Sequence, residues 1–346
     1  MALRVDFTHP LRSFVAELEL TVAQGSTLAL VGPSGAGKTT VLRVVSGLLR
    51  PQRGTVTLGD ETWLDSERGV FAPPERRRVG YLFQEYALFP HLDVAANVGF
   101  GARRRELVGE LLERLGIAHL AGARPRDLSG GERQRAALAR SLAREPGVLL
   151  LDEPLSALDA HTKAAVRLEL NELLRELELP TIIVSHDFED AAALADSVGV
   201  IVDGRVLQTG SAGELVAAPA DPFVATFTGA NLLQGSAVGS VDGVTEVLLD
   251  SGLTAWSADR ASGRVSLVVY PWDVSLARES PGGSALNHLR GPIASIVPLG
   301  DRLRVRVGPI VAEVTAASAH RLELREGEVV VATFKATATR LLPLSR

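Results

Sequence analysis

The sequence predicts an α/β fold with a parallel sheet, followed by a smaller domain made almost entirely of β-strands. Before residue 228, short apolar runs alternate with helical segments, and a glycine-rich loop separates one apolar run from a helix. After Gly229, short β-rich runs are punctuated by glycine instead. We therefore expect one domain over residues 1–228 and a second over residues 229–346.

The glycine-rich loop, GPSGAGKTT, follows the apolar strand Thr27–Val31 and precedes helix-spaced apolar residues over Thr40–Leu49. Glycines let backbone N–H groups approach phosphate oxygens, and a helix N-terminus favours an anion. Lys38 is placed to reach the β and γ phosphates of a nucleotide, and the Thr39 hydroxyl to contact Mg²⁺. The predicted phosphate site comprises Gly32, Pro33, Ser34, Gly35, Ala36, Gly37, Lys38, Thr39 and Thr40.

The apolar run Val148–Leu151 is typical of a central parallel strand covered on both faces. Asp152 falls at the end of this strand, where open α/β sheets bind ligands, and can hold Mg²⁺ through water. Glu153 is the better candidate for polarising an attacking water. Two acids before Pro154 also occur in ordinary loops after buried strands, so this block alone leaves both interpretations open.

The block LSGGERQR, Leu128–Arg135, places a serine and two glycines ahead of good helix formers. This pattern predicts a second helix N-terminus that binds an anion, with Ser129, Gly130 and Gly131 as its contacts. A second phosphate-binding loop is accounted for if it serves the nucleotide held by a partner subunit.

The segments that follow continue the alternation of helix and strand. Asp203-Gly204 predicts a tight hairpin, which makes the last pair of strands antiparallel. Between Gln84 and Leu128 the pattern is helical. The expected later elements are helix Ala164–Leu177, strand Thr181–Val184, helix Phe188–Ala195 and strand Val198–Val202.

In this order, the three blocks resemble the ATP-binding subunits of ABC transporters. GPSGAGKTT resembles the family's Walker A motif, LSGGE its signature sequence and VLLLDEP its Walker B motif. The resemblance implies a P-loop ATPase fold with a helical subdomain over about residues 85–145. It also implies ATP and Mg²⁺ as cofactors, and ATP sites that a second copy of the chain completes.

Other stretches carry the resemblance further. Gln84 matches the Q-loop glutamine, His186 matches the switch histidine near the γ-phosphate, and SALD resembles the D-loop, which places Ser156 and Asp159 at the dimer interface. Phe14 is the candidate for the adenine-stacking aromatic, with His9 as the less typical alternative. The implied catalytic residues are Glu153, His186 and Gln84, and the implied Mg²⁺ ligands are Thr39, Gln84 and Asp152.

The β-rich runs after Gly229 predict one or two small barrels joined by the turn-rich link Arg278–Ser284. The segments Ser284–Ile293, Ala312–Leu322 and Phe334–Leu341 resemble the molybdate-binding Mop/TOBE-like, OB-like barrel that is appended to the ATPases of molybdate importers. Ser284, Lys335 and Thr337 supply donors and a cation for a tetrahedral oxyanion. Alternatively, these residues only close the barrel, with Lys335 solvated on an edge strand.

Composition narrows the setting. The 346 residues include no cysteine, which excludes disulfides, zinc ribbons and thiol catalysis. A net charge of −5 argues against a nucleic-acid partner. Apolar runs stay short of the ~18–20 residues that span a bilayer, and the N-terminus lacks the apolar core of a signal peptide. The basic clusters Arg76–Arg78 and Arg103–Arg105 are interpreted as solvated faces, or else as contacts with a partner or with lipid headgroups.

The expected function is that of an ATP-hydrolysing subunit that powers import of an oxyanion, with molybdate first and sulfate, tungstate or another anion as alternatives. The expected partners are a second copy, integral membrane permease subunits and, indirectly, a substrate-binding protein. The expected location is peripheral, at the cytoplasmic face of the cell membrane. An oxyanion-sensing or storage protein and a soluble ABC ATPase are the alternatives from other classes.

Overall fold

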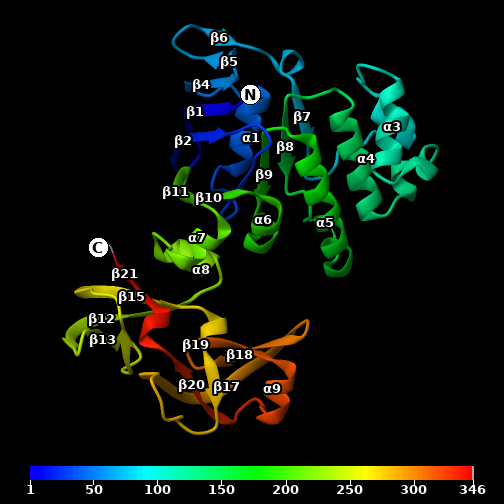
Figure 1. The fold of residues 1–346 in the computed structure, drawn as a ribbon. Helices are drawn as coiled ribbons and strands as arrows, with labels where there is room; N and C mark the ends of the chain where they lie inside the picture. Colours follow the sequence, from blue (N-terminus) through cyan, green and yellow to red (C-terminus); the bar gives the residue numbers. More distant parts are fainter. Residues whose placement is uncertain (157, 345–346) are drawn as a thin grey trace. The chain divides into compact units, whose positions relative to one another are not determined.

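The buried strands predicted around the glycine-rich loop lie in one six-stranded sheet of the computed structural model, which describes residues 1–156 and 158–344 (Figure 1). The order is β11–β10–β3–β9–β8–β7, and all pairings except that of β10 with β11 are parallel. The predicted parallel α/β sheet is therefore confirmed. Its strands are β3 Thr27–Val31, β7 Val79–Leu82, β8 Val148–Asp152, β9 Thr181–Ser185, β10 Ser197–Val202 and β11 Arg205–Gly210.

The predicted hairpin between β10 and β11 is present. Asp203 and Gly204 both have positive φ, at 46° and 75°, as a tight turn between twisted antiparallel strands requires. The hairpin also contacts the segment that precedes β2 Val15–Val22. There the Cα atom of Gly204 packs against the ring of Phe14.

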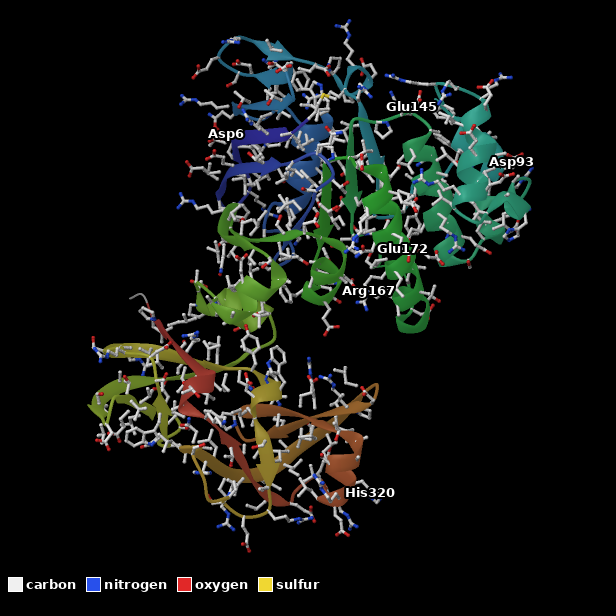
Figure 2. The ribbon with its side chains drawn as sticks, viewed as in Figure 1. Asp6, Asp93, Glu145, Arg167, Glu172 and His320 are labelled. Carbon is white, nitrogen blue, oxygen red and sulfur yellow. The ribbon has the colours of Figure 1, made fainter. Side chains whose placement is uncertain are left out.

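Helices flank the six-stranded sheet (Figure 1). Helices α5 Ala160–Leu177 and α6 Phe188–Leu194 pack together, and the Arg167 guanidinium of α5 lies 3.7 Å from the Asp190 carboxylate of α6 (Figure 2). The helical region over residues 85–145 contains α2 Val94–Gly99, α3 Glu106–Arg114 and α4 Gly130–Leu142, with α4 packed against β7.

A second sheet, which the sequence analysis did not predict, is antiparallel and has the order β2–β1–β4–β5–β6. Its strands alternate between buried and exposed residues, so one face is apolar and covers helix α1 Lys38–Ser46. The remaining strands are β1 Leu3–Pro10, β4 Arg53–Leu58, β5 Glu61–Asp65 and β6 Val70–Phe71.

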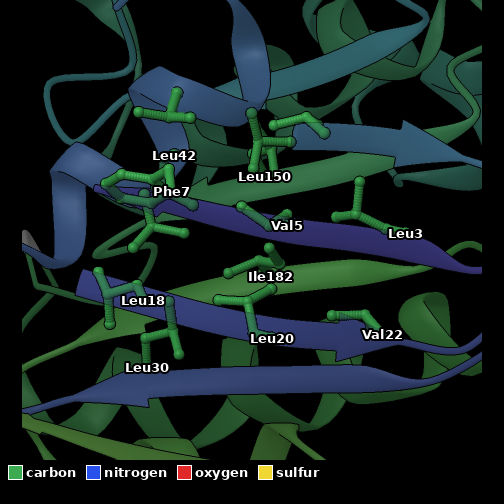
Figure 3. Packing of buried hydrophobic residues seen from close by; sticks show 14 of the residues in the cluster. Leu3, Val5, Phe7, Leu18, Leu20, Val22, Leu30, Leu42, Leu150 and Ile182 are labelled. Carbon is green, nitrogen blue, oxygen red and sulfur yellow. The ribbon is translucent and has the colours of Figure 1, made fainter. Parts of the chain in front are cut away.

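Helix α1 lies between the two sheets in a single apolar core (Figure 3). Leu42 of α1 is fully buried there with Phe7 of β1, Leu30 of β3 and Leu150 of β8. Because protein cores are close-packed, this helix has little freedom to shift. The glycine-rich loop at its N-terminus is therefore held in place by two sheets.

Arg77 fixes the other end of α1. Its guanidinium is buried and donates hydrogen bonds to the carbonyls of Val44 and Val45, both at 2.7 Å, and of Ala72 at 2.8 Å. Burial lowers the pKa of Arg77 to about 10. The expectation that the cluster Arg76–Arg78 forms a solvated or partner-binding face is thus wrong for its central residue, because a helix C-terminus offers unpaired carbonyls to a cation.

By internal contacts the chain divides into two units, Met1–Glu214 and Leu215–Arg346, a division that falls before residue 228. The second unit contains α8 Pro222–Phe227 and two five-stranded sheets, ordered β14–β13–β12–β15–β21 and β16–β20–β17–β18–β19. Helix α7 Ala212–Ala217 lies at the division. The strands are β12 Asn231–Val241, β13 Val244–Leu249, β14 Thr254–Ser257, β15 Gly263–Val269, β16 Ser275–Ala277, β17 Asn287–Leu299, β18 Arg302–Val307, β19 Ile310–Thr315, β20 Val329–Phe334 and β21 Thr339–Pro343.

These two sheets share one apolar core. Each sheet contains strands from before and from after the predicted link Arg278–Ser284. Strand β16, before the link, pairs with β20 after it, while the last strand, β21, pairs with β15 before it. The segment that resembles a Mop-type barrel therefore does not close on itself, and the second unit is one structure.

Candidate functional site

A pocket of about 590 Å³ lies against the glycine-rich loop. Its walls include most of residues 34–40, the segment 11–14 and the side chains of Gln84 and Glu153. The loop can adopt this path only with glycine at Gly32, where φ is 146° and a Cβ atom would lie 2.0 Å from the carbonyl oxygen of Ile201. The predicted phosphate loop thus borders a pocket of nucleotide-binding size.

Lys38 begins helix α1 at the base of this pocket. Its side chain is buried, and its ammonium donates hydrogen bonds to the carbonyls of Gly32 at 2.9 Å and Pro33 at 2.8 Å. Burial lowers the pKa of Lys38, while the nearby carboxylates of Glu153 and Asp152 oppose that shift. The cation is therefore held within the loop that is predicted to bind phosphate.

Asp152 ends strand β8 and meets Thr39 as predicted. Its carboxylate accepts hydrogen bonds from the Thr39 hydroxyl and the Tyr81 hydroxyl, each at 3.3 Å. Burial raises the pKa of Asp152, and these two hydrogen bonds oppose the shift. A partly desolvated carboxylate beside a hydroxyl suits a hard cation such as Mg²⁺, which needs few protein ligands when phosphates supply the others.

Tyr81 is a site residue that sequence reasoning missed. Burial and the negative charge of Asp152 raise the pKa of its phenol. Tyr81 lies in β7, three residues before Gln84, and it orients the carboxylate that ends the neighbouring strand β8. The signal in the sequence that could have identified Tyr81 is its position in the strand that precedes Gln84.

Glu153 brings together the three predicted catalytic residues. Its Oε2 atom accepts a hydrogen bond from Gln84 Nε2 at 3.0 Å and lies 3.3 Å from Nδ1 of His186. The backbone of Glu153 has φ of 48°, an unusual value for a residue other than glycine. This conformation is fixed by hydrogen bonds from Glu153 N to the Val184 carbonyl and from Ser156 to the Glu153 carbonyl.

The second predicted anion site lies elsewhere. Ser129 caps helix α4 in a reciprocal arrangement with Glu132, in which each side chain accepts a hydrogen bond from the other residue's backbone N–H. Ser129 is exposed, and among the described residues Ser129, Gly130 and Gly131 do not line the pocket at Lys38. Ser129 is therefore open to solvent and lies outside the chain's own pocket at the glycine-rich loop.

The predicted interface segment follows Glu153 directly. Ser156 is exposed and hydrogen-bonds the Glu153 carbonyl, and the Asp159 carboxylate accepts a hydrogen bond from the backbone N–H of Thr162 at 3.1 Å. Ala157, between them, lies outside the described residues. The Ser156 hydroxyl is therefore part of the turn that holds Glu153.

The two candidates for adenine stacking, Phe14 and His9, differ in their position relative to the pocket. Phe14 lines the pocket at the loop, and its ring packs on Gly204, where a Cβ atom would approach it to 2.8 Å. His9 lies in β1 outside the pocket lining, and its buried Nδ1 has no hydrogen-bond partner in the described part of the chain. Of the two candidates, Phe14 and not His9 therefore lines the pocket.

The predicted oxyanion residues Ser284, Lys335 and Thr337 are all exposed, and no hydrogen bond or ion pair joins their side chains within residues 1–156 and 158–344. Lys335 is exposed, but it follows β20, a strand between β16 and β17, and occupies the N-cap position of the 3₁₀ turn Ala336–Ala338, so its predicted place on an edge strand is wrong. Their neighbour Asn287 is buried and binds both the N–H and the carbonyl of Trp256, at 2.6 and 3.0 Å, which fixes the start of β17.

Among the described residues, every helix is too short or too polar to span a bilayer.

Comparisons with known proteins agree with this geometry. The family model described as ABC transporter matches residues 15–156, and that of the TOBE domain matches residues 283–341. The molybdate/tungstate import ATP-binding protein WtpC of Pyrococcus horikoshii is 36% identical over 94% of this chain and 95% of its own length. The molybdenum import ATP-binding protein ModC of Rhizobium etli is 39% identical over 98% and 99%.

Among solved structures, the dimeric ATP-binding cassette MJ0796, in a post-hydrolysis state with ADP and Pi, matches with a TM-score of 0.51 and 27% identity. That match covers 61% of this chain and 98% of the cassette. The pocket at Lys38, the capped helix at Ser129 and these matches lead to one assignment: the chain belongs to the ABC transporter family of ATP-binding proteins and ends in a TOBE domain.

Proposed function

We propose that this chain is the ATP-hydrolysing subunit of an ABC importer for an oxyanion, with molybdate as the first candidate. The observation that supports hydrolysis is the convergence of Lys38, Thr39 and Asp152 at the pocket, with Glu153 held between Gln84 and His186. These groups supply the positioning and the electrostatics that phosphoryl transfer to water requires. The test is the rate of ATP hydrolysis by the variants Glu153→Gln and Ser129→Asp.

In the proposed reaction, the glycine-rich loop and Lys38 bind the ATP phosphates, and Thr39, Asp152 and Gln84 would hold Mg²⁺, which neutralises phosphate charge when bound. Glu153 orients or deprotonates the attacking water, and His186 supports the γ-phosphate as charge develops. Because Ser129, Gly130 and Gly131 do not line their own chain's pocket at Lys38, a second copy of the chain supplies this anion-binding helix N-terminus.

Closure of two copies over ATP is proposed to move the helical region that contains α2, α3 and α4. Gln84, which contacts Glu153, also begins the stretch that leads into this region. The proposed partners are therefore a second copy and integral membrane permease subunits, with a substrate-binding protein acting indirectly. The chain would sit peripherally at the cytoplasmic face of the membrane.

Phe14 is proposed to stack on adenine, and Phe14→Ala should weaken ATP binding roughly five- to a hundredfold, the scale of one base–aromatic stack. Equilibrium titration of the full chain with a fluorescent ATP analogue measures this loss. Phe14→Tyr keeps the aromatic face and should retain most of the affinity, while the control His9→Ala should leave it unchanged. Equal affinity of Phe14→Ala and the unmodified chain would remove Phe14 from the nucleotide site.

Oxyanion import is supported by the names of the two relatives, which cover the chain almost completely and are described as molybdate/tungstate and molybdenum import proteins. Sulfate remains an alternative cargo with the same tetrahedral shape. A storage or sensing protein would leave the hydrolytic groups at Glu153 without a task. A soluble ABC ATPase would not bring down integral membrane proteins from a detergent extract, whereas a transporter subunit should.

Ser284, Lys335 and Thr337 are proposed to bind the transported oxyanion, and their exposure leaves their donors available. Calorimetry of the full chain with molybdate, tungstate and sulfate should show binding that weakens at least roughly tenfold in Lys335→Ala. The full chain is required because β16 and β15 complete the sheets of the C-terminal segment. Arg321→Ala, in α9 Ala316–Arg321, is the control for loss of one positive charge. Unchanged binding in Lys335→Ala would place the oxyanion elsewhere.

A further inference from the structure

The second unit has a pocket of about 390 Å³ that neither predicted site uses. It is lined by residues of the neighbouring strands β17, β18 and β19 together with residues 229–232, which lead into and begin β12 (strands in Figure 1). Ser284, Lys335 and Thr337 do not line it. Its volume lies within the range of small-molecule sites.

Positive charge is concentrated on one face of β18. Arg302, Arg304 and Arg306 alternate along the strand and therefore point to the same side. Glu313 of β19 accepts a hydrogen bond from Arg302 at 2.7 Å and lies 3.7 Å from Nε of Arg304. Asp301 also acts electrostatically on Arg302, so Arg302 has two acidic partners, whereas Arg304 shares Glu313 and Arg306 has no ion-pair partner among the described residues.

Two of these arginines line the pocket and have free donors. Arg306 is exposed, and its side chain makes no hydrogen bond or ion pair to any described residue. The Arg304 side chain makes no hydrogen bond in the described part of the chain, and its shielded Nε atom lies 3.7 Å from Glu313, beyond hydrogen-bond distance. The terminal guanidinium nitrogens of both arginines therefore have donors that an anion in the pocket would satisfy.

The walls of the pocket are held rigidly. Asn231 is buried at the start of β12, and its side-chain amide donates to the Val311 carbonyl and accepts from the Val311 N–H, both at 2.8 Å. This pair of hydrogen bonds joins β12, in the sheet β14–β13–β12–β15–β21, to β19. Arg306 lies beside this contact, because its Cα partner in β19 is Val311. A preorganised pocket loses less entropy on binding a ligand.

The chemistry of the lining defines the ligand. Leu232, Val297 and Val311 make apolar walls, and the hydroxyl of Ser295 lies on the strand position opposite Arg306. A guanidinium group matches the geometry of a phosphate, whereas the apolar walls suit a carbon skeleton. We propose that this pocket binds a small organic phosphate ester, with Arg304 and Arg306 on the phosphate and the organic part against Val297.

The proposal is independent of the proposed function, because the pocket draws on neither the ATP site nor Lys335. It is tested by calorimetry of the full chain with phenyl phosphate, after Mg²⁺ and a non-hydrolysable ATP analogue have saturated the glycine-rich loop. We expect saturable binding that is tighter than that of inorganic phosphate. Arg304→Ala and Arg306→Ala should each weaken it at least roughly tenfold, the scale of a charge-assisted hydrogen bond.

Two further variants make the result interpretable. Val297→Glu places a negative charge at a side chain that is 53% exposed, so it should weaken binding without affecting folding. Arg290→Ala removes an exposed arginine of β17 outside the pocket and should leave binding unchanged. Absence of binding, or equal binding in Arg306→Ala, would refute the proposal. Equal affinity for inorganic phosphate would refute the role of the apolar walls.

A lipid headgroup carries the same phosphate chemistry. Binding of the chain to phosphatidic acid vesicles that depends on Arg306, with no binding of soluble phenyl phosphate, would assign this face to a membrane surface and overturn the proposal.

Discussion

Glu153→Gln is expected to reduce steady-state ATP hydrolysis at least about a hundredfold, the contribution of a general base. The amide keeps the size of the side chain and can still hydrogen-bond Gln84 and His186, which both lie at Glu153 Oε2. It cannot take a proton from water. ATP binding should therefore persist, and two copies should stay closed over unhydrolysed nucleotide.

Phosphate release, equilibrium ATP binding and sedimentation with ATP measure these three properties. The matched control is Glu145→Gln, because Glu145 (labelled in Figure 2) also has a positive φ, at 50°, but ion-pairs with Arg104 outside the pocket. This control should hydrolyse ATP normally. Rapid turnover by Glu153→Gln would assign water activation to another group, and loss of ATP binding would indicate a structural role.

Ser129→Asp is expected to abolish hydrolysis to a similar extent, at least about a hundredfold, while a dilute chain binds ATP with unchanged affinity. Aspartate caps a helix as well as serine does, so α4 should keep its N-terminus. The added negative charge would repel the nucleotide of the second copy where serine donates a hydrogen bond. The expected loss matches that of one preorganised donor in other enzymes.

Two control variants separate the effect of the negative charge in Ser129→Asp from the other effects of the substitution. Ser129→Asn also caps the helix but is neutral, so it should retain far more activity than the aspartate variant. Ser211→Asp makes the same change at a second reciprocal cap, formed by Ser211 and Glu214 at α7, and should leave hydrolysis unaffected. The shared-site model fails if dilute Ser129→Asp binds ATP poorly, or if a strictly monomeric preparation hydrolyses ATP at full rate.

Much of the first unit was predictable because its signals are local. The short apolar runs of β3, β8 and β9 are buried along their whole length, as strands covered on both faces require. The antiparallel sheet escaped prediction although β2 alternates strictly between exposed and buried residues. Arg77 was misassigned because a run of three arginines looks alike whether its central guanidinium meets water or the carbonyls of a helix.

The amino-acid sequence alone determined the phosphate loop, the helix that begins after Ser129 and the acids at the end of β8, since each depends on residues adjacent in the chain. The tertiary structure alone decided three features. Gln84 and His186 meet at one oxygen of Glu153, and two arginines border a pocket fixed by Asn231. Strand β16 pairs with β20 in one sheet, and β21 pairs with β15 in the other. These features are contacts between residues far apart in sequence. They exist only once packing has set the separation of the strands, which no local pattern encodes.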